Sequence, residues 1–77
     1  MIQRTIKLNL VTDIRSFVDA SSRCNFDIDL VSGRYVIDAK SIMGIYTMDL
    51  SKPIQLNIHT DDNEAAAFLK EIDRILV

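Results

Sequence analysis

The sequence is poor in residues that break regular structure and in residues that build reactive sites. Its 77 residues include two glycines, one proline, one cysteine, one histidine and no tryptophan. So few glycines and prolines, together with 48% hydrophobic residues, exclude an unstructured chain and favour a compact globular fold. This length is near the lower limit at which one hydrophobic core suffices without disulfides or metal. We therefore expect residues 1–77 to form a single domain.

The scarce residue types also exclude several functions. Cys24 is the only cysteine, so it cannot form an internal disulfide or a cysteine-based metal site, and a reducing compartment is favoured. The sequence contains neither a glycine-rich phosphate loop nor a nucleophile elbow. We therefore expect a protein that is not an enzyme and that binds no cofactor.

Charge and hydropathy limit the possible partners. Nine basic and eleven acidic residues give a net charge of −2, and no stretch gathers enough Lys or Arg to follow a phosphate backbone. This argues against nucleic acid as a partner. The first ten residues, MIQRTIKLNL, alternate polar with apolar residues, unlike a signal peptide, and no segment approaches the length of a membrane span. We expect a cytoplasmic protein with no membrane partner.

Hydrophobic periodicity predicts the order strand, helix, strand, strand, helix, strand, helix. The strands are predicted from alternating apolar residues: Ile6, Leu8 and Leu10; Phe26, Ile28 and Leu30; residues 35–38 after a Ser32-Gly33 turn; and Ile54, Leu56 and Ile58 after Pro53. The helices are predicted to start at residues that can cap them: Thr12 or Asp13, Ser41, and Thr60 or Asp61. The last helix has a wide apolar stripe: Ala65, Phe68, Leu69, Ile72, Ile75 and Leu76. These elements predict a two-layer α+β fold in which three helices cover one face of a four-stranded sheet.

Residue chemistry offers few candidates for a site. His59 is the only histidine, and it is out of phase with the apolar residues of the last strand, so we expect it on the surface. The acidic residues that follow it, Asp61 to Glu64, are explained as first-turn charges of a helix, and we expect no metal site. Cys24 lies at the end of a helix among apolar residues, which favours packing over a reactive thiol.

The order of elements and the segment KSIMGI at Lys40–Ile45 resemble HPr, the histidine-containing phosphocarrier family of the bacterial phosphoenolpyruvate:sugar phosphotransferase system. The resemblance runs from Asn25 to about Leu76. It includes the strand segment Asn25–Leu30 and the acidic residues Asp61–Glu64 before an alanine-rich helix. It implies the HPr-like open-faced sandwich, with an antiparallel sheet and the order β-α-β-β-α-β-α.

The sequence departs from this family where the family carries its phosphoryl group. HPr proteins use a histidine in a Gly-(Ile/Leu)-His-x-Arg-Pro loop at the amino end of the first helix, whereas this chain has Thr12–Phe17 there. Counting forward from the first strand places Arg15 at the histidine position, and counting backward from Asn25 places Leu10 there. Neither side chain can carry a phosphoryl group. Because the region is also shorter than in the family, we expect the active loop and part of the first helix to be missing, and phosphoryl transfer between enzyme I and enzyme II components to be absent.

Ser41 has two interpretations. The resemblance implies a serine that HPr kinase/phosphorylase phosphorylates, after which the phosphoserine form acts as corepressor for the catabolite control transcription factor. A phosphate at a helix N-terminus is electrostatically favourable. Serine is equally a common helix cap, and this explains Ser41 without any regulation.

The residues around Ser41 lead to two functions. Lys40, Ile42, Met43 and Tyr46 match a partner-docking surface of the family, and the alternative is burial against the sheet or in a homodimer. The first function is an adaptor that docks the transcription factor or an enzyme of sugar metabolism. The second is a plain interaction or dimerisation domain that keeps this segment for folding alone. Arg15 and Arg23 would discriminate, because kinase recognition needs them beside Lys40 in one positive surface.

Overall fold

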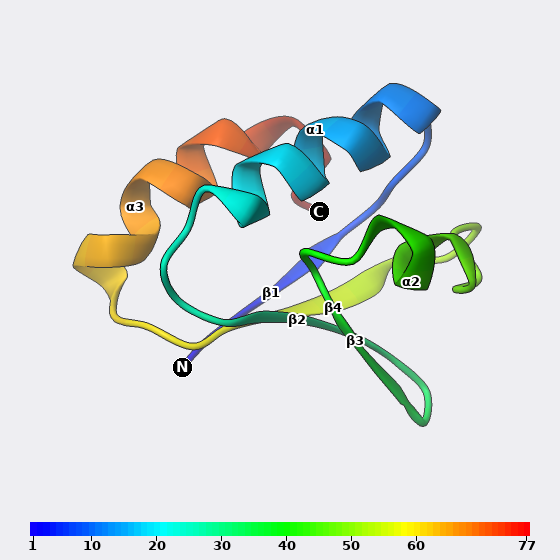
Figure 1. Cartoon of the computed structure of the whole chain (residues 1–77), viewed down its shortest axis with the longest axis horizontal. Coiled ribbons are helices and arrows are strands. Elements are labelled where there is room, and N and C mark those ends of the chain that lie inside the picture. Colours follow the sequence, from blue (N-terminus) through cyan, green and yellow to red (C-terminus); the bar gives the residue numbers. More distant parts are fainter.

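A computed structural model describes all 77 residues and has the predicted order of elements. The elements are β1 (Ile2–Ile6), α1 (Val11–Ser22), β2 (Ile28–Ser32), β3 (Tyr35–Asp38), α2 (Ile42–Tyr46), β4 (Ile54–Ile58), α3 (Asp62–Glu71) and a 3₁₀ turn, η1 (Asp73–Ile75). The four strands form one antiparallel sheet in the order β1-β4-β2-β3. Figure 1 shows α1 and α3 side by side over one face of this sheet, with the short α2 near β3. The predicted two-layer α+β fold is confirmed.

The core lies between the sheet and the helices. Along β4, Ile54, Leu56 and Ile58 are buried, while Gln55 is exposed. Seventeen buried apolar residues, drawn from every layer of the fold, form a single cluster. No helix of the structure is both long enough and apolar enough to cross a membrane.

An aromatic group joins the two long helices to the start of the second strand. The ring centroids of Phe17 in α1 and Phe68 in α3 are 6.2 Å apart, and Phe26, just before β2, meets Phe68 edge-on at 6.5 Å. Tilted and edge-on pairs at these distances are favourable for aromatic rings. The packing of α1 against α3 therefore depends on Phe68, which contacts both partners.

The first strand lies earlier in the chain than its alternating pattern predicts. β1 spans Ile2–Ile6, and its last residue pairs with Ile54, the first residue of β4. Pro53 precedes that residue, so β4 offers no further partner to the residues after Ile6. Leu8 is still buried, but outside the strand, and Leu10 is exposed. The alternating residues 6–10 therefore do not form one strand. They span the end of β1, the connection after it and the residue before α1.

The last helix also ends earlier than predicted. α3 stops at Glu71, after which η1 turns the chain back toward the sheet. Ile75 is buried there, and Leu76 forms an isolated antiparallel bridge with Ile6. The apolar stripe at these positions is real, but its last two members reach the core and β1 through a turn and an extended segment.

Candidate functional site

The amino end of α1 is closed by a carboxylate from within the helix. Leu10 is the N-cap residue, and Asp13 accepts a hydrogen bond from the Leu10 N–H at 3.1 Å. Asp13 is only 5% exposed, and its other oxygen pairs with Arg74 at 3.3 Å. The prediction that Thr12 or Asp13 is the cap was wrong, because Asp13 reaches back from the third helical position to satisfy the cap amide.

The two candidates for the histidine position are well separated on α1. Leu10 directly precedes the first helical residue, and its side chain is exposed. Arg15 is also exposed, but it lies in the second turn. With twelve residues, α1 completes just over three turns, so it has the full length of a typical helix. The short part of this region is the connection 7–10 between β1 and α1.

Ser41 caps α2, as predicted. Its backbone is extended, and its Oγ accepts a hydrogen bond from the Gly44 N–H at 3.2 Å. The Ser41 side chain is exposed to solvent. The hydroxyl is therefore both a structural cap and open to modification.

Gly44 allows α2 to approach the sheet closely. A Cβ at this position would lie 2.8 Å from Cγ2 of Ile37 in β3 and 3.1 Å from the Ser41 Oγ. Such a separation is shorter than carbon atoms tolerate, and Cγ2 of a β-branched side chain cannot rotate away freely. The next residue, Ile45, is completely buried beneath the helix. These two residues of the segment thus hold α2 against the core.

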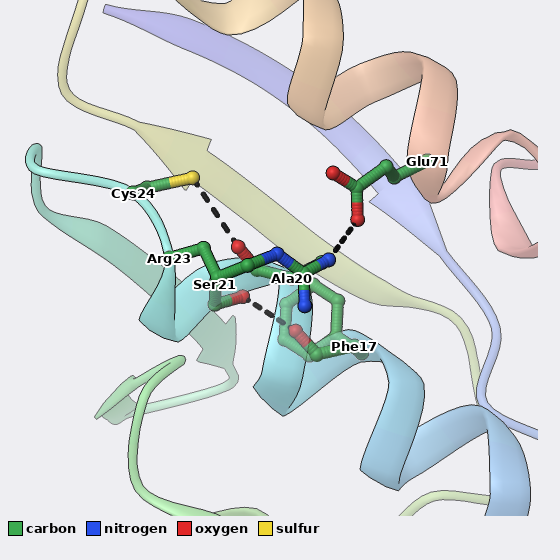
Figure 2. Close-up of polar contacts among 6 residues, drawn as sticks. All are labelled: Phe17, Ala20, Ser21, Arg23, Cys24 and Glu71. Carbon is green, nitrogen blue, oxygen red and sulfur yellow. Dashed lines mark hydrogen bonds and ion pairs between the residues drawn. The ribbon is translucent and has the colours of Figure 1, made fainter.

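Two of the three basic residues expected to form a positive surface with Ser41 are bonded to other parts of the protein. The Lys40 ammonium group donates a hydrogen bond to the Cys24 carbonyl oxygen at 3.1 Å. Arg23 forms an ion pair with Glu71, at the ends of α1 and α3 (Figure 2). Of these three residues, only Arg15 has neither an ion pair nor a side-chain hydrogen bond. Sequence reasoning placed Lys40 on a docking surface and missed its contact with Cys24. Every residue has a backbone carbonyl, so the sequence cannot indicate which one a lysine will bind.

The apolar residues predicted to dock partners differ in exposure. Met43 is 73% exposed and Tyr46 is 46% exposed, whereas Ile42 is half-buried and packs against the core. α2 therefore presents the apolar side chains of Met43 and Tyr46 to solvent, while Ile42 is directed toward the core. Leu10 and Val11 add two more exposed apolar side chains at the start of α1.

His59 lies far along the sheet from the start of α1. It follows Ile58, which pairs with Ile2 at the beginning of β1, whereas α1 begins after the opposite end of that strand. The His59 Nε2 lies 2.7 Å from an Asp29 carboxylate oxygen. Sequence reasoning missed this partner, which is thirty positions away in the chain. No group of three or more ligating side chains comes together with metal geometry.

Cys24 sits just after α1 and bonds to the end of that helix. Figure 2 shows its thiol directed at the Ala20 carbonyl, and the two atoms are 3.4 Å apart. Three positions earlier in the chain, the Ser21 hydroxyl donates a buried hydrogen bond to the Phe17 carbonyl. Partial burial raises the pKa of the Cys24 thiol, and the nearby Lys40 charge only partly offsets this. A raised pKa disfavours the thiolate, which supports packing as the role of this residue.

Comparison with known proteins places this geometry in one family. The sequence model described as the PTS HPr component phosphorylation site matches residues 13–77. Among solved structures, HPr-C-His from Thermoanaerobacter tengcongensis superposes with a TM-score of 0.74 at 24% identity, covering 95% of this chain and 92% of that one. The phosphocarrier protein HPr from Bacillus anthracis superposes with a TM-score of 0.66 at 22% identity, covering 91% and 94%. No curated protein sequence matches the chain significantly.

The two structural likenesses concern the fold, because their sequence identities are low. The sequence model is more specific, and its match extends from the first turn of α1 to the last residue. It includes the KSIMGI segment and both cap residues, Ser41 and Asp61. This chain therefore belongs to the HPr family of the phosphotransferase system.

Proposed function

We propose that this protein is an HPr-family adaptor that has lost the phosphocarrier reaction and that docks protein partners through α2 under the control of Ser41. One observation carries the loss of the reaction. The amino end of α1 begins with Leu10, Val11, Thr12 and Asp13, none of which offers a nucleophilic nitrogen.

The electrostatics at this end of α1 support the same conclusion. A phosphoryl group held at a helix N-terminus needs free N–H groups and positive potential. Here the Asp13 carboxylate already accepts the Leu10 N–H and places a negative charge in the first turn. A phosphate at this position would be repelled by the carboxylate, and His59 lies at the other end of the sheet.

The docking surface is inferred from the residues of Lys40–Tyr46 that have no structural role. Lys40 binds a backbone carbonyl, Gly44 fits closely against β3, and Ile45 fills the core. The side chains of Met43 and Tyr46 are 73% and 46% exposed and form no hydrogen bond or aromatic pair. Exposed apolar side chains beside an adaptable methionine are typical of a binding hot spot. By family resemblance, the partners are HPr kinase/phosphorylase and the catabolite control transcription factor or an enzyme of sugar metabolism.

The proposed switch is transfer of the ATP γ-phosphoryl group to the Ser41 Oγ, with release of ADP. A phosphoserine at this position keeps acceptors for the Gly44 N–H, so α2 can remain folded. It would also add about −1.5 to −2 charges beside Met43 on the docking surface.

The first test is phosphorylation by a Gram-positive HPr kinase/phosphorylase, followed by intact mass. We expect one phosphate on the wild type and on Ser22→Ala, which changes an exposed serine outside α2, and none on Ser41→Ala. Authentic HPr in the same tube controls for kinase activity. An unmodified wild type beside a modified HPr would overturn the switch.

A second test concerns the lost reaction. Incubation with phosphoenolpyruvate and enzyme I should leave this protein unmodified while authentic HPr gains an acid-labile phosphoryl group. Labelling that disappears in His59→Gln would show that His59 works as a carrier and would refute the proposed loss.

The alternative function is an interaction or dimerisation domain that keeps the segment for folding alone. It is favoured by the structural roles of Lys40, Gly44 and Ile45. The variants Met43→Ala and Tyr46→Ala distinguish the two functions by their effect on partner binding. Both variants should weaken partner binding if α2 is a docking surface and should have no effect if the segment serves only the fold.

A further inference from the structure

We propose that this chain self-associates through the free edge of β3, which pairs antiparallel with β3 of a second copy about a two-fold axis at Val36. The proposal is independent of the function proposed for Ser41 and α2. It starts from the difference between the two edges of the sheet, β1 and β3.

The end of the chain covers the carboxyl-terminal end of the β1 edge. The Lys7 N–H donates to the Ile75 carbonyl, and the Val77 N–H donates to the Thr5 carbonyl, both at 2.9 Å. Leu76 bridges to Ile6 between these two bonds. No element of the protein pairs with the outer edge of β3. An uncovered edge is a template for pairing with another chain.

The backbone groups of Val36 point to this open edge. Ser32 and Tyr35 flank a two-residue turn with positive φ at Gly33, so they form the hydrogen-bonded pair that closes the hairpin. Pairing alternates along an antiparallel ladder, so the Val36 N–H and C=O face outward. The Ala39 N–H donates to the Ile28 carbonyl, which agrees with this alternation. Beyond Val36, the Asp38 carbonyl accepts from the Ser41 N–H, which limits the length of the free edge.

The sequence of β3 is complementary to itself in this arrangement. With Val36 opposite the partner's Val36, Tyr35 meets the partner's Ile37, and Arg34 meets the partner's Asp38. Neither Arg34 nor Asp38 forms an ion pair within its own chain. Asp38 is also directly opposite Asp29 in the β2–β3 register, and like charges opposite each other destabilise a sheet. The partner's Arg34 would relieve this repulsion at both ends of the two-fold contact.

The apolar surface of the hairpin fits the same contact. Tyr35 and Val36 are 72% and 63% exposed, high values for strand residues of this size. A groove of about 540 Å³ lies beside β3, between the hairpin and the segment after α2, and includes Tyr35, Ile37 and Met48 in its lining. Because Tyr35 pairs with the partner's Ile37, each copy places an aromatic ring at the partner's groove. A second copy is therefore the occupant that both the charges and the shape favour.

The contact is short, so the dimer should be weak. Stable interfaces usually bury roughly 1,200–2,000 Å² in total. A contact made by a four-residue strand and one groove is expected to bury less than this. We expect the dimer to be populated at about 0.1–1 mM, a range that sedimentation and NMR chemical shifts can follow.

The test uses a charge swap between two variants. Arg34→Glu places a carboxylate opposite the partner's Asp38, and Asp38→Arg places a guanidinium opposite the partner's Arg34, so each variant alone should associate about tenfold more weakly. In an equimolar mixture both contacts become attractive again, and association should return to the wild-type level. A wild type that remains monomeric at about 1 mM overturns the proposal. Association that is unchanged in both variants also overturns it, since the contact then lies elsewhere.

A cross-link keeps the proposal testable if Asp38→Arg fails to fold, since this change also removes the bond from Asp38 to the Lys40 N–H. In a Cys24→Ser background, Val36→Cys should form a disulfide-linked dimer under mild oxidation. Gln3→Cys, an exposed position on β1, is the matched control and should link much more slowly. Equal rates for the two positions, or no link at Val36, would contradict a β3 contact.

Discussion

Gly44 decides how closely α2 can lie on the sheet. Sequence reasoning treated KSIMGI as a mark of family and assigned its apolar side chains to docking. The structure gives the glycine a separate role, because a Cβ at Gly44 would meet Ile37 at 2.8 Å. The segment therefore combines residues needed for the fold with residues that stay exposed.

Gly44→Ala should destabilise the protein by up to about 2 kcal/mol. Alanine favours a helix over glycine by about 1 kcal/mol, but overpacking against a fixed side chain typically costs 1–3 kcal/mol. The steric term should win, because the new Cβ also approaches the Ser41 Oγ that caps the helix. Urea unfolding measures the difference.

Two variants give the control for this prediction. Met43→Ala changes a neighbouring exposed residue and should cost less than about 0.5 kcal/mol. Ile37→Leu removes the Cγ2 atom that would clash, so Gly44→Ala should cost less in that background. If the two changes were simply additive, the close contact would not be the cause.

At the scale of elements, the start of α1 shows what a sequence pattern can hide. Asp13 was predicted as a possible N-cap, yet it acts from inside the helix on the Leu10 N–H and is nearly buried. Its second partner, Arg74, comes from η1, near the end of the chain. Asp13 therefore stabilises the start of α1 and also links it to η1.

Asp13→Asn should destabilise the protein by about 1–2 kcal/mol, since it weakens the bond to the Leu10 N–H and removes the charge that faces Arg74. Arg74→Gln should cost less than about 1 kcal/mol, because Arg74 is 70% exposed and surface ion pairs contribute little. Chemical denaturation of both variants compares the two. Equal losses would mean that the ion pair, and not the helix cap, gives Asp13 its importance.

Most of the fold could be predicted because the hydrophobic periodicity, the helix-cap residues and the turn residues of each segment indicate the same element. The order of elements, the Ser32-Gly33 turn, the start of β4 after Pro53 and the Ser41 cap all depend on neighbouring residues. The errors at β1 and α3 have one cause, since apolar residues reach the core from irregular segments as well as from regular ones. The contact of Lys40 with Cys24 and that of His59 with Asp29 join distant positions, and one sequence holds no record of such pairs.

At the scale of the whole molecule, a protein of this size has little stability to lose. A chain of 77 residues is expected to have a free energy of unfolding of about 4–12 kcal/mol. Its core consists of seventeen residues, and Phe68 contacts Phe17 within this core and Phe26, which packs against it. One aromatic side chain therefore links α1, α3 and the approach to β2.

Phe68→Ala should cost about 3–5 kcal/mol, because it leaves a cavity between the two long helices and removes both aromatic pairs. At the lower end of the expected stability this would unfold the protein at 25 °C, which far-UV circular dichroism would detect. Phe68→Leu keeps most of the volume and should remain folded. Tyr46→Ala, on the exposed side of α2, should leave the unfolding midpoint unchanged. If Phe68→Ala were as stable as Tyr46→Ala, the packing of α1 on α3 would not hold the layers together. The contrast also matters for function, because loss of partner binding in Tyr46→Ala can then be assigned to the docking surface and not to the fold.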